Sequence, residues 1–247
     1  MKIIADTHIF YYLGLDPELF EKVSAEPISP NIYNILELSS TPNLIKIEDE
    51  VREAHRKLIH YNDHLILEPP FIYIAKMFCD VDFFAEKQFG DFFKFSSAIA
   101  NGAKVDPHKI ELYHAWAKDI RSNGDVAAEF ANKKLEEIRP NIIDKKAHRK
   151  KDTIQVTLSL IRSLVIDASK GGCDVTEKDL SGIELLVRTM DFFFKELEVS
   201  QQKMKPNDLA DLFMLAYVQP GDKFWTTEKQ WIRMIADAGC EEYLFKI

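Results

Sequence analysis

Short apolar runs that end on acidic residues lie near both ends of this chain, and they constrain its fold more than any other feature. Residues 2–6 are rich in β-branched side chains and stop at Asp6, and residues 223–227 lead into Glu228. Both runs have the length and composition of buried strands, and helical patterns flank them. Strands that alternate with helices predict a parallel sheet that is covered on both faces.

The acidic residues fall where such a sheet places a binding site. Ligands bind beyond the carboxyl ends of parallel strands, and Asp6 and Glu228 follow two of them. Glu37 lies in an apolar helix that begins near residue 30, and Asp208 and Asp211 lead into the apolar stretch 212–216. Carboxylates that converge from separate segments usually surround a cation, and oxygen ligands suit Mg²⁺ or Mn²⁺. This pattern predicts metal-assisted phosphodiester chemistry.

The segments 3–10, 35–38, 208–211 and 226–231, taken together and in this order, resemble the PIN-domain family. The resemblance implies an α/β fold, a three-layer α/β/α sandwich around a central parallel sheet. It also implies a Mg²⁺- or Mn²⁺-dependent ribonuclease with a pocket of three or four carboxylates. We expect a PIN-like domain formed by residues 1–70 and 205–247, with residues 71–204 as a helical insertion or accessory subdomain.

The resemblance assigns each acidic residue a place. Asp6 matches the first carboxylate of the family and Glu37 the second. The third is Asp208 or Asp211; both are expected to line the pocket because residues three apart share a helix face, and Asp211 lies deeper in the apolar run. Glu228 stands at the fourth position, where Asp is more common.

The expected roles follow from the same comparison. We expect Asp6 and Asp211 to contact the metal directly or through water, and Glu37 and Asp208 to orient its waters or bind a second ion. Thr7 and Thr226 would orient the carboxylates or the phosphate. Two further positions depart from the family pattern: His8 stands where Asn or Ser is frequent, and Trp231 where Phe is typical. The alternative explanation is structural, because Asp6, Asp208 and Glu228 can each cap a turn or a helix.

The middle of the chain predicts helix after helix, over residues 71–99, 106–121, 124–138, 151–169 and 176–199. Within it lies a basic stretch that can attract a phosphate backbone or simply form a solvated helix end. Its cations are Lys145, Lys146, Arg149, Lys150 and Lys151.

Composition limits the class of protein. The formal net charge of −8 argues against a general nucleic-acid binder, although a local basic face remains compatible with RNA. The three cysteines are odd in number and far apart, which argues against a disulfide framework. No apolar run is long enough to cross a membrane, and no signal-peptide pattern opens the chain, so we expect a cytoplasmic protein.

The sequence therefore predicts a metal-dependent endoribonuclease that acts on single-stranded RNA. Two rivals stay open: a non-catalytic PIN-like module that binds RNA or a protein partner, and a structure-specific DNA nuclease. A toxin role is a lesser alternative, because the chain is longer than such toxins usually are. Oligomeric state and substrate sequence do not follow from the residues.

Overall fold

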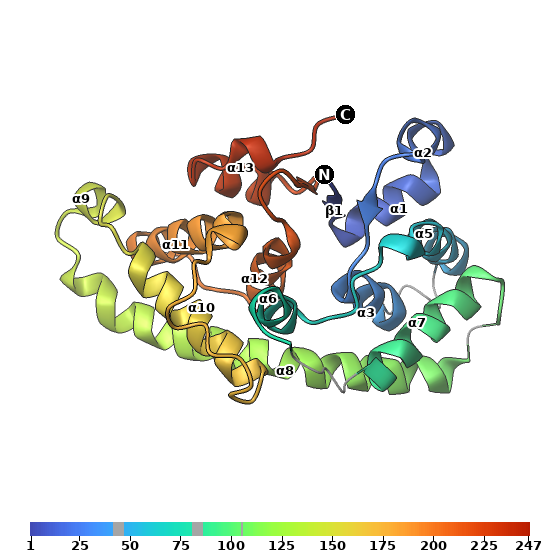
Figure 1. Ribbon diagram of the computed structural model, residues 1–247, viewed down its shortest axis with the longest axis horizontal. Helices are drawn as coiled ribbons and strands as arrows, with labels where there is room; N and C mark the ends of the chain where they lie inside the picture. The colour runs from blue at the N-terminus through green and yellow to red at the C-terminus, as the bar shows by residue number, and fades with distance from the viewer. Residues whose placement is uncertain (42–46, 81–85, 105) are drawn as a thin grey trace.

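The computed structural model describes residues 1–41, 47–80, 86–104 and 106–247, which form a mixed α/β fold (Figure 1). Its strands are β1 (Ile3–Ala5), β2 (Ile28–Ser29) and β3 (Lys223–Trp225). The α-helices before the long central one are α1 (Thr7–Leu15), α2 (Pro17–Val23), α3 (Ile32–Ser40), α5 (Glu48–His60), α6 (Pro70–Phe78) and α7 (Glu86–Ala100). The remaining α-helices are α8 (Pro107–Ile138), α9 (Lys145–Arg149), α10 (Ile154–Ala168), α11 (Glu184–Val199), α12 (Pro206–Met214) and α13 (Lys229–Asp237). Short 3₁₀ helices are η1 (Asn62–His64), η2 (Arg139–Asn141), η3 (Ser181–Ile183), η4 (Leu215–Tyr217) and η5 (Glu241–Tyr243).

The described strands form a three-stranded parallel sheet in the order β2-β1-β3. In the pairing of β1 with β3, Ala5 lies opposite Trp225. The carboxyl ends of these two strands therefore meet at one edge, as the sequence predicted. Single parallel bridges extend the sheet on both sides, from Asn31 to Ile66 and from Phe224 to Leu244.

The central strand β1 is buried on both faces because its side chains alternate between two clusters. Ile4 and Phe224 pack into one cluster, with side chains of α6, α10, α11, α12 and α13. Ile3, Ala5 and Trp225 pack into the other, with side chains of α1, α3, α5 and α7. Figure 1 shows these two groups of helices on opposite sides of β1. The first cluster joins the sheet to helices of the 71–204 segment.

Most of the predicted elements are present, with several differences. The sequence pattern also predicts strands at 64–67 and 242–247, and these reduce to the single bridges at Ile66 and Leu244. The helix expected over 71–99 is two helices, α6 and α7, and the one expected from 176 begins at Glu184. The start of a helix at Pro42 lies outside the described residues; the helix that follows, α5, begins at Glu48.

Helix α8 replaces the two helices predicted over 106–121 and 124–138. It has 32 residues, which corresponds to about 48 Å at 1.5 Å per residue. Figure 1 shows it running along one side of the molecule, beside α3 towards one end and α12 nearer the middle. Gly124 allows the close approach to α12, because an added Cβ would lie 3.2 Å from the carbonyl oxygen of Pro206. Gly124 is therefore a packing residue within a continuous helix.

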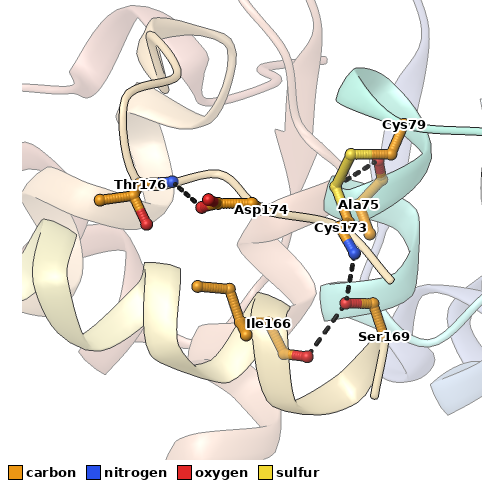
Figure 2. Close-up of a disulfide and its surroundings, with 7 residues drawn as sticks. All are labelled: Ala75, Cys79, Ile166, Ser169, Cys173, Asp174 and Thr176. Atoms are coloured by element: carbon orange, nitrogen blue, oxygen red, sulfur yellow. Dashed lines mark hydrogen bonds between the residues drawn. A yellow bond between two sulfur atoms is a disulfide. The ribbon is translucent and has the colours of Figure 1, made fainter. Parts of the chain in front are cut away.

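Two of the three cysteines form a disulfide, contrary to what their number and spacing indicated. Figure 2 shows Cys79, the C-cap of α6, bonded to Cys173 in the loop after α10. The backbone N–H of Cys173 also donates to the Ser169 hydroxyl at 3.1 Å, and Cys240 is free and buried. Disulfides are rare in cytosolic proteins, so the cytoplasmic location stays a prediction. Among the described helices, none has both the length and the hydrophobicity that a membrane crossing requires.

Candidate metal site

The site begins at the edge where β1 and β3 end together. Asp6 follows β1, and its backbone N–H donates to the carbonyl of Trp225 at 2.9 Å. The hydroxyl of Thr226 donates to the Asp6 carboxylate at 2.8 Å. The Asp6 side chain is only 10% exposed, so this hydrogen bond fixes a carboxylate that has little contact with solvent.

His8 and Glu228 complete a compact donor set with Asp6. The Nδ1 atom of His8 lies 3.4 Å from a Glu228 oxygen and 3.8 Å from an Asp6 oxygen. One ligand atom from each of the three residues lies within 4.8 Å of the others. Asp6 is buried, Glu228 half-buried and His8 exposed, so the set opens towards solvent. This group can hold a metal ion.

The carboxylates around His8 control its protonation. They raise the pKa of His8 to about 9, chiefly through Asp6, against the opposing effect of burial. In the metal-free protein the imidazole is therefore protonated at neutral pH and partly neutralises Asp6 and Glu228.

Asp211 is the most strongly perturbed carboxylate of the site. Burial and the charges of Asp6, Glu37 and Glu228 together raise its pKa to about 8. The indole N–H of Trp231 donates to Asp211 at 3.1 Å and opposes the rise. Crowded carboxylates favour protonation unless a cation neutralises them, so a cation bound here would favour the ionised form of Asp211.

Glu37 reaches the same region from α3. Its charge contributes to the raised pKa values of His8, Asp211 and Glu228, which places it near all three. Glu37 also lines a cavity of about 490 Å³ with Thr7 and His8. The structure therefore gathers Asp6, Glu37, Asp211 and Glu228 at one edge of the sheet, where their electrostatic interactions are mutual.

A helix-capping role accounts for the position of Asp208 but not for those of Asp6 and Glu228. The Asp208 carboxylate accepts the backbone N–H of Lys205 at 2.8 Å and so closes the first turn of α12. Asp6 and Glu228 occupy the N-cap positions of α1 and α13, yet in the described chain neither side chain makes a capping hydrogen bond. Asp208 remains close enough for its charge to raise the pKa of Glu228.

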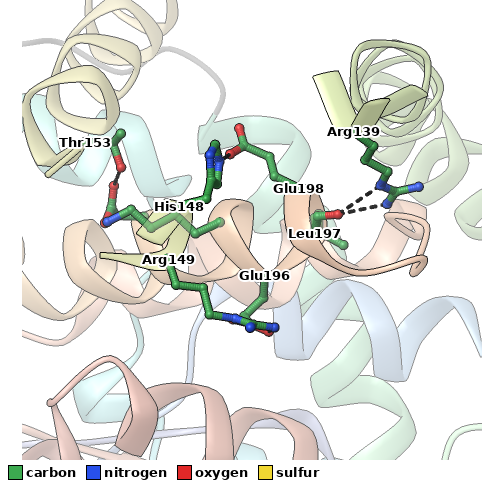
Figure 3. A network of polar contacts seen from close by, with 9 residues as sticks. Arg139, His148, Arg149, Thr153, Glu196, Leu197 and Glu198 are labelled. Atoms are coloured by element: carbon green, nitrogen blue, oxygen red, sulfur yellow. Dashed lines mark hydrogen bonds and ion pairs between the residues drawn. The ribbon is translucent and has the colours of Figure 1, made fainter. Parts of the chain in front are cut away.

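The basic stretch does not join the acidic site. Figure 1 shows α9 at one end of the molecule, apart from β1 and α1. Figure 3 shows Arg149 and His148 directed at Glu196 and Glu198 of α11, with which they pair. Lys145, Lys146, Lys150 and Lys151 are exposed. These lysines can contact only a ligand that extends along the surface, and the two paired residues attach α9 to α11.

Three functional side chains were not assigned a site role from the sequence. His8 belongs to the donor set, Trp231 supports Asp211, and Asn34 contacts both neighbours of Asp6, as shown below. A signal existed for His8, which stands two residues after a strand-end carboxylate. Asn34 also offers a signal, because it is a polar residue of a largely apolar helix and stands three residues before Glu37.

Comparisons with models of protein families, with curated proteins and with solved structures found no match to this chain.

Proposed function

We propose that this chain is a metal-dependent endoribonuclease that hydrolyses phosphodiester bonds in single-stranded RNA. The observation that carries the proposal is the convergence of four carboxylates, from β1, α3, α12 and the β3–α13 turn, at one sheet edge. Their mutual repulsion, seen in the raised pKa of Asp211, is the electrostatic condition that a divalent cation relieves. The choice of RNA rests on the resemblance of the acidic segments to PIN-domain ribonucleases.

The donor set suits the cofactors Mg²⁺ or Mn²⁺, with Mn²⁺ as the first choice for a test. Carboxylate oxygens serve both ions, whereas imidazole nitrogen is a ligand for transition metals. The ion would be held by Asp6, His8 and Glu228. Its positive charge would be balanced further by the carboxylates of Asp211 and Glu37. When bound, the ion supplies a water of lowered pKa and positive charge beside the scissile phosphate.

The other residues of the site act by orientation. Thr226 holds the Asp6 carboxylate through its hydroxyl, and the same oxygen accepts the backbone N–H of Glu228 at 3.1 Å. One hydroxyl therefore links the first and the fourth acidic residues. The exposed lysines of α9 would contact a strand long enough to reach them from the site.

One observation favours the second candidate, a non-catalytic module that binds RNA or a protein partner. In the metal-free protein His8 supplies a positive charge between Asp6 and Glu228, and this charge lessens the demand for a metal. A module of this kind would keep the acidic edge as part of the fold without cleaving a substrate.

The deciding experiment measures cleavage of labelled single-stranded RNA and of matched DNA, in Mn²⁺ and in EDTA. Asp6→Asn removes a charge from the donor set, and Asp211→Asn replaces a carboxyl by a neutral group of the same shape. Asp237→Asn, at an exposed aspartate of α13, is the matched control. We expect RNA cleavage that requires Mn²⁺, persists in the control and disappears in both site variants.

Other outcomes separate the alternatives. Cleavage of DNA in preference to RNA would identify a DNA nuclease. No cleavage and no Mn²⁺ binding by the wild-type protein would refute the catalytic proposal and leave the binding module.

A further inference from the structure

Asp6 and Glu37 must lie at a set separation if both act on one cation, yet they come from different elements. Asp6 follows β1, and Glu37 lies in the second turn of α3. Backbone pairing of β1 with β2 positions only the start of α3, which begins at Ile32 shortly after β2. A side chain that joins the helix to the end of β1 would fix the rest of its placement.

Asn34 makes this connection. Its side-chain amide donates to the carbonyl of Ala5 at 3.1 Å and to the hydroxyl of Thr7 at 3.1 Å. These two residues immediately precede and follow Asp6. The amide oxygen of Asn34 accepts the backbone N–H of Asn31 at 2.8 Å, which also caps α3. Asn34 is fully buried, so both amide protons and the oxygen depend on these partners.

The chemistry of the amide is specific to this place. An aliphatic side chain would leave the Ala5 carbonyl without this donor, and a carboxylate would place oxygen against oxygen. The amide supplies two donors and one acceptor, which satisfy all three neighbours as they are arranged here.

Glu37 follows Asn34 by three residues, so both side chains lie on nearly the same face of α3. A helix is rigid over one turn, and fixing Asn34 against Ala5 and Thr7 also fixes where Glu37 projects. We propose that Asn34 is a positioning residue that sets the separation of the Asp6 and Glu37 carboxylates for cation binding. This inference rests on the proposed metal-dependent function.

The test compares Mn²⁺ affinity in Asn34→Asp and Asn31→Asp of the full chain, by calorimetry. Asn34→Asp keeps the oxygen that accepts from Asn31 and removes the two donors. Asn31→Asp makes the same chemical change on the same helix; its side-chain oxygen still caps Tyr33 N–H at 3.0 Å. Its amide nitrogen has no hydrogen-bond partner among the described residues, so little is lost there.

We expect Asn34→Asp to weaken Mn²⁺ binding by roughly 10- to 100-fold, as for other residues that orient metal ligands. Asn31→Asp removes no hydrogen bond of the Asn31 amide nitrogen, so we expect it to bind Mn²⁺ much more tightly than Asn34→Asp does. Urea unfolding of both variants shows whether a loss of Mn²⁺ affinity comes only from a less stable fold. Added negative charge would strengthen cation binding, so charge cannot explain a decrease. Should Asn34→Asp not fold, Asn34→Ser takes its place, because serine is tolerated near helix N-termini.

The outcomes distinguish this inference from the function on which it rests. Equal Mn²⁺ affinity in the two folded variants, with a wild-type protein that binds Mn²⁺ and cleaves RNA, would overturn the role of Asn34 alone. Wild-type protein that neither binds Mn²⁺ nor cleaves would overturn both proposals.

Discussion

The hydroxyl of Thr226 donates a 2.8 Å hydrogen bond to the carboxylate of Asp6, which lies 220 positions earlier in the chain. The two residues meet because β1 and β3 pair in parallel with Ala5 opposite Trp225. The contact joins the beginning of the chain to its end, at the edge where the acidic residues gather. It is the most direct link between the sheet and the candidate metal site.

Replacing Thr226 by valine should weaken metal binding with little change in shape. Valine keeps the volume but removes both the donor to Asp6 and the acceptor for the Glu228 N–H. We expect Mn²⁺ affinity to fall about tenfold, the low end for residues that orient ligands. Calorimetric titration measures the change. Thr226→Ser, which keeps the hydroxyl, is the control and should match wild type; equal affinity in the valine and serine variants would contradict the role of this hydrogen bond.

Trp231→Phe should raise the pKa of Asp211 further. The indole N–H stabilises the ionised carboxylate by donating to it, and phenylalanine keeps an aromatic ring without this donor. Carboxyl-carbon chemical shifts of the metal-free protein, followed against pH by NMR, measure the shift. Trp225→Phe makes the same kind of change at another buried tryptophan and should leave the Asp211 titration in place. A lower or unchanged pKa in Trp231→Phe would rule out this contribution.

The sequence was sufficient for the sheet and for much of the site because both depend on short patterns. Runs of β-branched residues that stop at a carboxylate predicted β1 and β3, and the parallel pairing of their ends is confirmed. Asp6 and Glu228 follow from the same pattern. The resemblance left Asp208 and Asp211 open as alternatives, and the structure separates them by their contacts: Asp208 closes the first turn of α12, whereas the half-buried Asp211 accepts the indole N–H of Trp231.

What the sequence could not predict depends on contacts between distant elements. The pairing of Cys79 with Cys173 requires α6 to lie beside the end of α10, and no local pattern encodes that. The continuity of α8 through Gly124 conflicts with the low helix propensity of glycine, and only the approach of Pro206 explains it. The role of Asn34 likewise appears only when α3 is placed against β1.

The contribution of His55 to stability should decrease as the pH falls below neutrality. Burial lowers the pKa of His55 to about 3 in the folded protein, where its Nδ1 atom lies 2.7 Å from the Ser96 hydroxyl. The unfolded chain takes up a proton near pH 6.5, so the stabilising contribution is present above pH 6.5 and is lost progressively towards pH 3. From pH 7 to pH 5 this linkage corresponds to about 2 kcal/mol of unfolding free energy.

The comparison with His55→Gln isolates this effect. Asp211 acts in the opposite direction: its raised pKa adds stability at low pH that is lost as the pH rises through about 8. Urea unfolding at pH 7 and pH 5 should therefore show a smaller decrease, or a gain, in His55→Gln relative to wild type. Identical pH dependence in the two proteins would contradict a buried, neutral His55.

Loss of the Cys79–Cys173 disulfide should destabilise the fold by about 2–4 kcal/mol. The bond closes a loop between residues 94 positions apart, so breaking it restores much conformational freedom to the unfolded chain. Urea unfolding of wild type with and without a reducing agent measures the difference, and Cys79→Ser should reproduce the reduced value and not respond to the agent. Cys240→Ala removes only the free thiol and should keep the full response. If the reducing agent leaves the unfolding free energy of the wild-type protein unchanged, these two cysteines are not joined in solution.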